Sequence, residues 1–450
     1  MPGHRGQRVR AGALRPGPAV ALILALTGCV GGGPGVSKFG FGASMQPDQP
    51  AAAGALAQAE GQGEQRSAII GDLLSRGSVL SPGSAYGQVA QAVTEANAGP
   101  ARAELRVARL KAEARSKNWL PRIKPTLSLT DLGETFASLL VEQVLFDGGA
   151  RKAERAFAAA DVEVAATTLA LDFNQRVFEG LGHYIRAQRA IEQGRLATAA
   201  AGRMAEYERI VTIRVDGGMS DRSEQQVIQQ KAAEMRARAN DDRFQAEQAL
   251  AELNAMASRD LSGVTGLSGL PADPGAPEPL AVLKARAEAA RSVAEAEAAR
   301  AGFGPGLKAR AALDQDGEVE SGLSVEFDKA IGLGTGAELD ALAMTTEVTD
   351  RRVAKVSEQA SRDIVALHHE IATLTARQAE GAGVLAQSEQ TLAMFVEQYK
   401  AGRRTLMEMV NMFESVSSMQ REQASLKYEI ALKQVQIARD RGVLVSGASL

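Results

Sequence analysis

Apolar residues along most of the chain recur at helical spacing, and two of the helical stretches are unusually long. One runs over 150–215 without a proline, and a second runs over 337–399. At about 1.5 Å per residue, each helix would be roughly 100 Å long. Helices in globular proteins average about 11–12 residues, so this length predicts coiled-coil packing.

Two shorter segments alternate between apolar and polar residues instead. Over 122–146, Ile123 and Leu127 alternate with Lys124 and Thr126, and the segment is divided by a turn at 131–134. This pattern predicts a β-hairpin, and 306–328 predicts a second one. An apolar face opposite a polar face suits a wall between water and an apolar phase. A small sheet packed on a helix is the alternative, because single hairpins carry weak membrane signals.

The elements repeat at a constant spacing of 184 residues, which is too long for a solenoid repeat of about 20–50 residues. Each copy is predicted as a helix, a hairpin, a long helix, a tight turn and a medium helix. The chain is therefore a duplicated unit. The landmarks that keep the spacing are 101–104 with 285–288, 121–124 with 305–308, Gly218 with Gly402, and Glu224 with Glu408.

The repeat fixes the predicted domain boundaries. Glycine commonly ends a helix in the left-handed conformation, which places one tip turn about 214–221, at Gly217 and Gly218, and another about 400–405, at Gly402. The predicted segments are a signal peptide (1–28), a flexible lipid-anchored segment (29–82), a first repeat (83–260), a proline-rich linker (261–278), a second repeat (279–444) and a C-terminal tail (445–450).

The N-terminus has the features of an export signal. Four arginines precede a short apolar stretch over 19–26, which ends in Leu26-Thr27-Gly28-Cys29. This ending resembles the lipobox of bacterial lipoproteins, which implies cleavage before Cys29 and lipidation of its new N-terminus. A buried free thiol is the alternative reading. Val30 is not the aspartate of the inner-membrane retention signal, so sorting to the outer membrane of a Gram-negative cell is expected.

Composition and chemistry exclude several classes of function. Charged residues make up 23% of the chain, are interspersed and give a net charge of −3, which argues against nucleic-acid binding. No Gly-x-Ser-x-Gly motif is present, and the adjacent His368 and His369 would point about 100° apart on a helix. We therefore expect no catalytic residues, no bound metal and no cofactor, and we predict that the chain is not an enzyme.

Four predicted strands cannot close a barrel, because about eight are the minimum for a filled one. Cyclic oligomers are the usual solution, and a trimer would supply twelve strands. The polar strand face would then line a water-filled lumen.

Over about 84–444 the sequence resembles the TolC-like family of outer-membrane efflux proteins. The resemblance rests on 145–149 (LFDGG), 399–408 (YKAGRRTLME) and 214–224. It implies a mainly α-helical fold with a membrane β-barrel: a trimeric 12-stranded barrel continued by a periplasmic coiled-coil tunnel. It also implies a periplasmic adaptor and an inner-membrane pump as partners. The strand-to-helix junction of the family matches Phe146, Asp147, Gly148 and Gly149.

The resemblance further implies a gate at the periplasmic tip. Tyr399 and Arg404 match inner-helix residues that make polar links, and Glu224 matches their acidic partner, with Ser223 as the alternative in the neighbouring register. Glu408 and Asn411 match two acidic constriction positions, but Asn411 is neutral. The focusing of cations should therefore be weaker than in members with two acids.

Together these observations predict the exit duct of a tripartite efflux pump or of a type I secretion system. The alternative is a non-conducting coiled-coil structural or adaptor lipoprotein. A family member whose barrel has failed is a third reading, because the second hairpin is rich in charge.

Overall fold

The computed structural model describes residues 67–97, 99–129, 135–271, 277–314 and 317–449, all within the unit 51–450. The signal peptide, Cys29 and the hairpin turn at 131–134 lie outside these residues, so what the sequence predicts for them stays a prediction. The described part is mainly helical, as the sequence predicted, and its four strands form one small sheet.

In the first repeat, helices and strands follow the order expected from the hydrophobic pattern. The long helix α4 has no proline to interrupt it, and it ends where Gly218 adopts a φ of 71°. The elements are α2 (Ala85–Glu95), α3 (Ala101–Ser116), β1 (Arg122–Leu129), β2 (Thr135–Phe146), α4 (Ala150–Asp216) and α5 (Arg222–Ala257).

The second repeat differs from the expectation at one place. The long helix expected over 337–399 consists of two helices that meet at Met344. In the first turn of α8, just after this point, the hydroxyl of Thr349 donates to the carbonyl of Thr345 (3.0 Å), and such back-bonding bends and slightly destabilises helices. The elements are α6 (Leu280–Ala301), β3 (Pro305–Asp314), β4 (Val319–Phe327), α7 (Thr335–Ala343), α8 (Thr345–Lys400) and α9 (Leu406–Asp440).

The duplication extends to individual hydrogen bonds. Gly218 donates its N–H to the carbonyl of Val215 (3.0 Å), and Gly402, 184 residues later, donates to Tyr399 (2.9 Å). The N-caps of the following helices, Asp221 and Thr405, keep the same spacing. The two tips are therefore equivalent structures.

The four strands form one antiparallel sheet in the order β1-β2-β3-β4, so the two hairpins join through β2 and β3. In register, Ile123 pairs with Val141, Val141 with Ala311, and Ala311 with Ser321. Because side chains alternate between faces, odd-numbered residues share one face of the sheet, up to the register shift in β2 that pairs Phe146 with Leu307. That face is mainly apolar, and the even-numbered face carries most of the charge.

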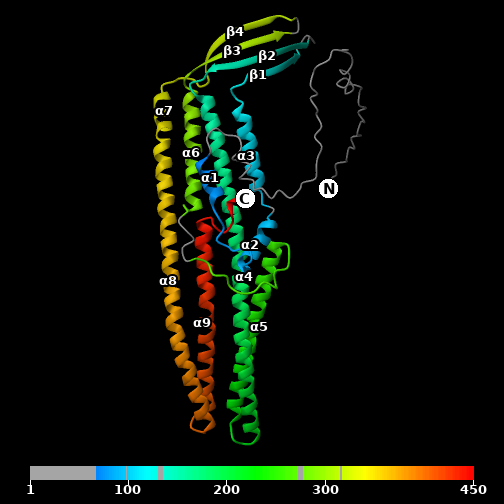
Figure 1. The fold of residues 1–450 in the computed structure, drawn as a ribbon, viewed down its shortest axis with the longest axis vertical. Coiled ribbons are helices and arrows are strands. Elements are labelled where there is room, and N and C mark those ends of the chain that lie inside the picture. The colour runs from blue at the N-terminus through cyan, green and yellow to red at the C-terminus, as the bar shows by residue number, and fades with distance from the viewer. Residues whose placement is uncertain (1–66, 98, 130–134, 272–276, 315–316, 450) are drawn as a thin grey trace, which may run out of the picture. The chain divides into compact units, whose positions relative to one another are not determined.

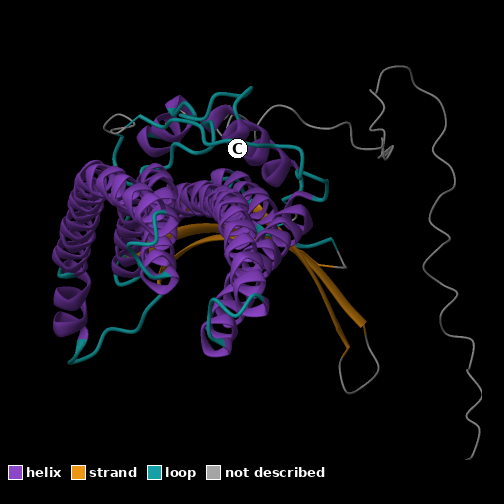
Figure 2. Ribbon diagram, turned by 90° about the horizontal axis from the view of Figure 1, so that it is seen from below, coloured by secondary structure: helices purple, strands orange, loops and turns teal. Residues whose placement is uncertain are grey.

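The sheet lies at one end of the helices, and both tip turns lie at the other (Figure 1). Helix α4 packs against α3, α5, α6 and α9, whereas α8 packs against α6 and α9. Viewed along their length, the helices form a curved layer (Figure 2). Among the described residues, no helix is both long and apolar enough to cross a membrane.

The ordered body includes part of the segment that was expected to be flexible. Helix α1 (Ala68–Ser75) buries Ile70 and Leu73 in the main core, with Ser67 as its N-cap. Arg76, only 6% exposed, donates to the carbonyls of Arg441 (2.6 Å) and Glu278 (2.8 Å). The predicted segment 29–82 thus ends in a packed stretch over 67–82, which buried apolar and guanidinium contacts fix.

Candidate functional site

The candidate site lies at the two tip turns. Gly218 and Gly402 have φ values of 71° and 69°, a region that costs other residues about 1–2 kcal/mol. Gly217 is the C-cap of α4 and has a negative φ. Both chain reversals therefore depend on one left-handed glycine each.

Tyr399 connects the two repeats at the tip. Its hydroxyl accepts a hydrogen bond from Nη1 of Arg214 (2.9 Å), and the guanidinium carbon of Arg214 lies 5.7 Å from the centre of the tyrosine ring. The contact joins α4 to α8. The sequence placed Arg214 at the start of the tip motif but did not identify it as the partner of Tyr399. The repeat offered a signal for this pairing, because Arg214 lies 184 residues before Gln398, the neighbour of Tyr399, and is therefore its equivalent in the first repeat.

Arg404 makes its contacts within its own helical hairpin. Its Nε donates to Gln398 (2.6 Å), its Nη1 lies 3.4 Å from Glu408, and its guanidinium carbon lies 3.7 Å from the ring centre of Phe395. Among the described residues, no bond joins Glu224 to Arg404 or Tyr399. A link through Glu224 stays a prediction for the assembled protein.

Glu408, the third residue of α9, helps to cap the start of that helix. Thr405 N–H donates to Oε2 of Glu408 (3.0 Å), and the N–H of Glu408 donates to the Thr405 hydroxyl (3.3 Å), which together form a capping box. The bonds from the Thr405 backbone and hydroxyl hold the pKa of Glu408 below its usual range. Asn411, one turn further on, is exposed. Both candidate constriction residues thus occupy the first turns of α9.

Behind the tip, ion pairs hold α9 against the first repeat. Nζ of Lys231 lies 3.0 Å from Glu414, and Nζ of Lys427 lies 2.6 Å from Glu192. Nη2 of Arg421 lies 3.0 Å from Oδ1 of Asp242, which is 3% exposed. No pattern in the sequence indicates these pairs, because each joins residues about 180 or more positions apart.

The strand-to-helix junction at 146–149 is formed by two left-handed glycines and by hydrogen bonds to Asp147. Gly148 and Gly149 have φ values of 60° and 94°, and Asp147 accepts hydrogen bonds from the N–H groups of Gly149 and Arg151 (both 3.0 Å). Aspartate thereby satisfies N–H groups at the start of α4. Phe146, the last residue of β2, is 56% exposed. The motif therefore makes the turn that joins β2 to α4.

The apolar face of the sheet is largely uncovered. Ile123 and Leu127 are 66% and 70% exposed, and Leu323 and Val325 are 69% and 65% exposed. A contiguous exposed apolar surface of this kind marks a contact with another protein or with a membrane.

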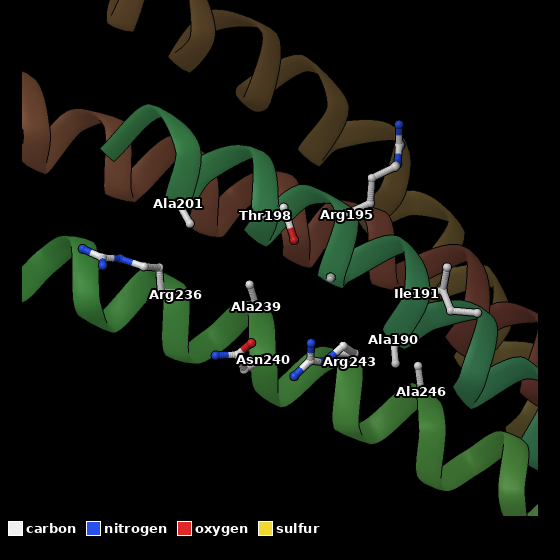
Figure 3. Close-up of a pocket in the computed structure, with 11 residues that line it drawn as sticks. Ala190, Ile191, Arg195, Thr198, Ala201, Arg236, Ala239, Asn240, Arg243 and Ala246 are labelled. Atoms are coloured by element: carbon white, nitrogen blue, oxygen red, sulfur yellow. The ribbon is translucent and has the colours of Figure 1, made fainter. Parts of the chain in front are cut away.

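A surface groove of about 680 Å³ separates α4 from α5 (Figure 3). Small residues such as Ala190, Ala201 and Ala239 line it, and Arg236 on its edge pairs with Glu208 at 3.0 Å. Within the described part of the chain, no group of three His, Cys, Asp or Glu residues could hold a metal ion.

No protein-family model matches the sequence, and no curated protein is similar to it. Among solved structures, the outer membrane protein VceC of Vibrio cholerae is similar, with 14% identity and a TM-score of 0.70. The match covers 80% of this chain and 98% of VceC.

Two further structures match comparably well. The CmeC outer membrane channel of Campylobacter jejuni has 12% identity and a TM-score of 0.67, covering 80% of this chain and 86% of CmeC. The open state of the MtrE outer membrane channel of Neisseria gonorrhoeae has 15% identity and a TM-score of 0.63, covering 83% of this chain and 95% of MtrE. The chain therefore has the fold of the TolC-like outer-membrane channels that its sequence resembles.

Proposed function

We propose that the protein is an outer-membrane exit duct of a tripartite efflux pump or of a type I secretion system. The fold likeness to outer membrane channels supports this role. In our proposal the protein is a homotrimer, held at the outer membrane by its sheet and by a lipid on Cys29, and its helices reach into the periplasm.

The observation that carries the proposal is the two-sided sheet. Burying a large apolar side chain is worth roughly 1.5–3 kcal/mol relative to water, so a face that leaves many of them exposed requires an apolar environment. The residues on that face that are more than half exposed include Ile123, Leu127, Val319, Leu323, Val325 and Phe327. Acyl chains of the outer membrane would cover them, while the even-numbered, charged face would line water.

Closing the sheet into a barrel requires more than one chain. The outer edges of β1 and β4 are unpaired within the described sheet, so each can pair with another strand. Three copies joined edge to edge would give a twelve-stranded barrel without free edges. The helices below would continue the barrel as a tunnel.

The tip would be the gate. Arg214 and Tyr399 tie α4 to α8 beside both turns, which supports a closed resting state. Docking of a periplasmic adaptor and an inner-membrane pump would break this contact and move the α8–α9 hairpin outward. Energy and substrate choice would come from the pump, and Glu408 and Asn411 would line the constriction.

A non-conducting scaffold is the competing function, and the position of the sheet separates the two. Trp119 is the only tryptophan, is 60% exposed, and lies just before β1. It would sit at the membrane interface, where such residues are enriched. In liposomes, lipids brominated near the headgroup should quench its fluorescence more than lipids brominated near the chain end. If neither lipid quenches it, the sheet lies outside the bilayer and the duct proposal fails.

A further inference from the structure

A continuous chain of opposite charges crosses the even-numbered face of the sheet. Nζ of Lys308 lies 3.1 Å from Glu326 and 3.4 Å from Asp328. Nε of Arg310 lies 3.4 Å from Glu142, and its Nη2 also pairs with Glu326. We call these five residues the strand charge cluster.

The cluster spans three strands and shares one face. Arg310 pairs in register with Glu142 on β2, and Lys308 lies two residues earlier on β3, so both side chains leave the sheet on the same side. The intervening Ala309, like Leu307 and Ala311, belongs to the apolar face. The opposite side of the sheet thus carries no part of the cluster.

This face cannot contact lipid. An arginine or lysine on the lipid side of a barrel strand costs about 2–4 kcal/mol at the bilayer midplane. The side chain of Lys308 is 17% exposed, and that of Arg310 is 39% exposed, so water reaches both. If the sheet forms a duct as proposed above, the cluster lies on the wall of its lumen.

We propose that the strand charge cluster sets the charge selectivity of the duct, favouring cationic over anionic solutes. It contains two cations and three carboxylates, which give a formal charge of −1 per chain and −3 in a trimer. Fixed charges that line a pore with low-dielectric walls concentrate ions of opposite sign. This inference rests on the proposed function, and it places a selectivity element in the strands in addition to any at the tip.

A purely structural role is the competing explanation, since cross-strand ion pairs contribute about 0.2–1 kcal/mol each. Two variants of opposite charge separate the two roles. Glu142→Gln/Glu326→Gln changes the cluster to +1, and Lys308→Gln/Arg310→Gln changes it to −3. Asp328→Asn changes it to 0 with little disturbance, because the Asp328 side chain is 62% exposed and its contact with Lys308 is 3.4 Å long.

The test is the zero-current potential of the full-length protein in planar bilayers across a KCl gradient, which gives the K⁺/Cl⁻ permeability ratio. We expect the ratio to fall about threefold or more in Glu142→Gln/Glu326→Gln and to rise by a similar factor in Lys308→Gln/Arg310→Gln. Asp328→Asn should lower it by less. Differences should shrink at 1 M salt, where charges are screened within about 3 Å. Arg243→Gln, on the α4–α5 groove, removes one charge away from the sheet; it is the control for a charge change elsewhere and should leave the ratio unchanged.

A failure of the selectivity role can be told apart from a failure of the duct itself. If the three variants conduct and the ratio stays unchanged, or if the two double variants shift it in the same direction, the cluster is structural and this inference is overturned. If the double variants do not fold, the ratio of Asp328→Asn decides in the same way. If wild type is closed and only Tyr399→Phe/Arg404→Ser conducts, the ratios are compared in that background. If neither form conducts, the duct is overturned, and the selectivity role with it.

Discussion

The ion pair between Arg421 on α9 and Asp242 on α5 gives the sharpest prediction about stability. Arg421 also donates to the carbonyl of Gln193 on α4 (2.9 Å), so one guanidinium joins three helices from both repeats. Gly194 makes room for this contact, because a β-carbon there would lie 3.3 Å from Cβ of Asp242. The substitution Arg421→Met removes this guanidinium.

The expected loss of stability follows from the burial of Asp242. Asp242 is 3% exposed, and without Arg421 its charge would be left buried and unpaired. Removing one partner of a buried pair costs about 3–5 kcal/mol. Because the side chain of Arg421 is 22% exposed, water can partly replace it, and we expect about 3 kcal/mol, the lower end of that range. This corresponds to a roughly 100-fold larger population of locally opened protein.

Hydrogen exchange of the native protein, followed by mass spectrometry, measures that population segment by segment. Exchange should accelerate in the parts of α5 and α9 that flank the pair. The double variant Asp242→Leu/Arg421→Met removes both charges and should return close to wild type. Arg243→Met, a neighbouring surface change, should alter exchange little. Wild-type exchange rates in Arg421→Met, or no recovery in the double variant, would refute the reasoning.

Three further predictions concern the second tip. Gly402→Ala should lower stability by about 1–2 kcal/mol, because the φ of Gly402 is 69°. Gly383→Ala, with open space around it in α8, should raise stability by about 0.5–1 kcal/mol. Shifts of the thermal midpoint in opposite directions check both. Thr405→Ala removes the N-cap of α9 and should cost about 1 kcal/mol, seen as faster exchange over 406–410, while Thr391→Ala in mid-helix should not have this effect. Because the pKa of Glu408 is lowered in the folded protein, the ionised Glu408 stabilises the fold fully above the unfolded pKa of about 4.3. This stabilisation is lost as the pH falls through the folded pKa, so the start of α9 should loosen below about pH 4 in wild type. Glu408→Gln should lack this acid step.

Much of the fold could be predicted from the sequence because its elements are long and strongly periodic. The 184-residue spacing located equivalent turns, and the alternation around Ile123 and Val325 located strands whose register places both residues on one face. The break at Met344 could not be predicted, since the helical pattern continues across it.

The candidate site was less predictable, because its contacts join distant residues. Tyr399 was identified, but its partner Arg214 depends on how α4 meets α8, which no local pattern encodes. Glu408 was assigned to a constriction, and within one chain its carboxylate is occupied by the capping box with Thr405. Likewise, the docking of α1 depends on Arg76 reaching two carbonyls far along the chain.

In our proposal this protein is a gated duct. Single-channel conductance of the purified protein in planar bilayers tests it most directly, with wild type beside Tyr399→Phe/Arg404→Ser. We predict small, stable openings for wild type and clearly larger openings for the double variant, since the contacts at the tip would be weakened. A folded trimer that conducts in neither form would contradict the duct and favour the scaffold.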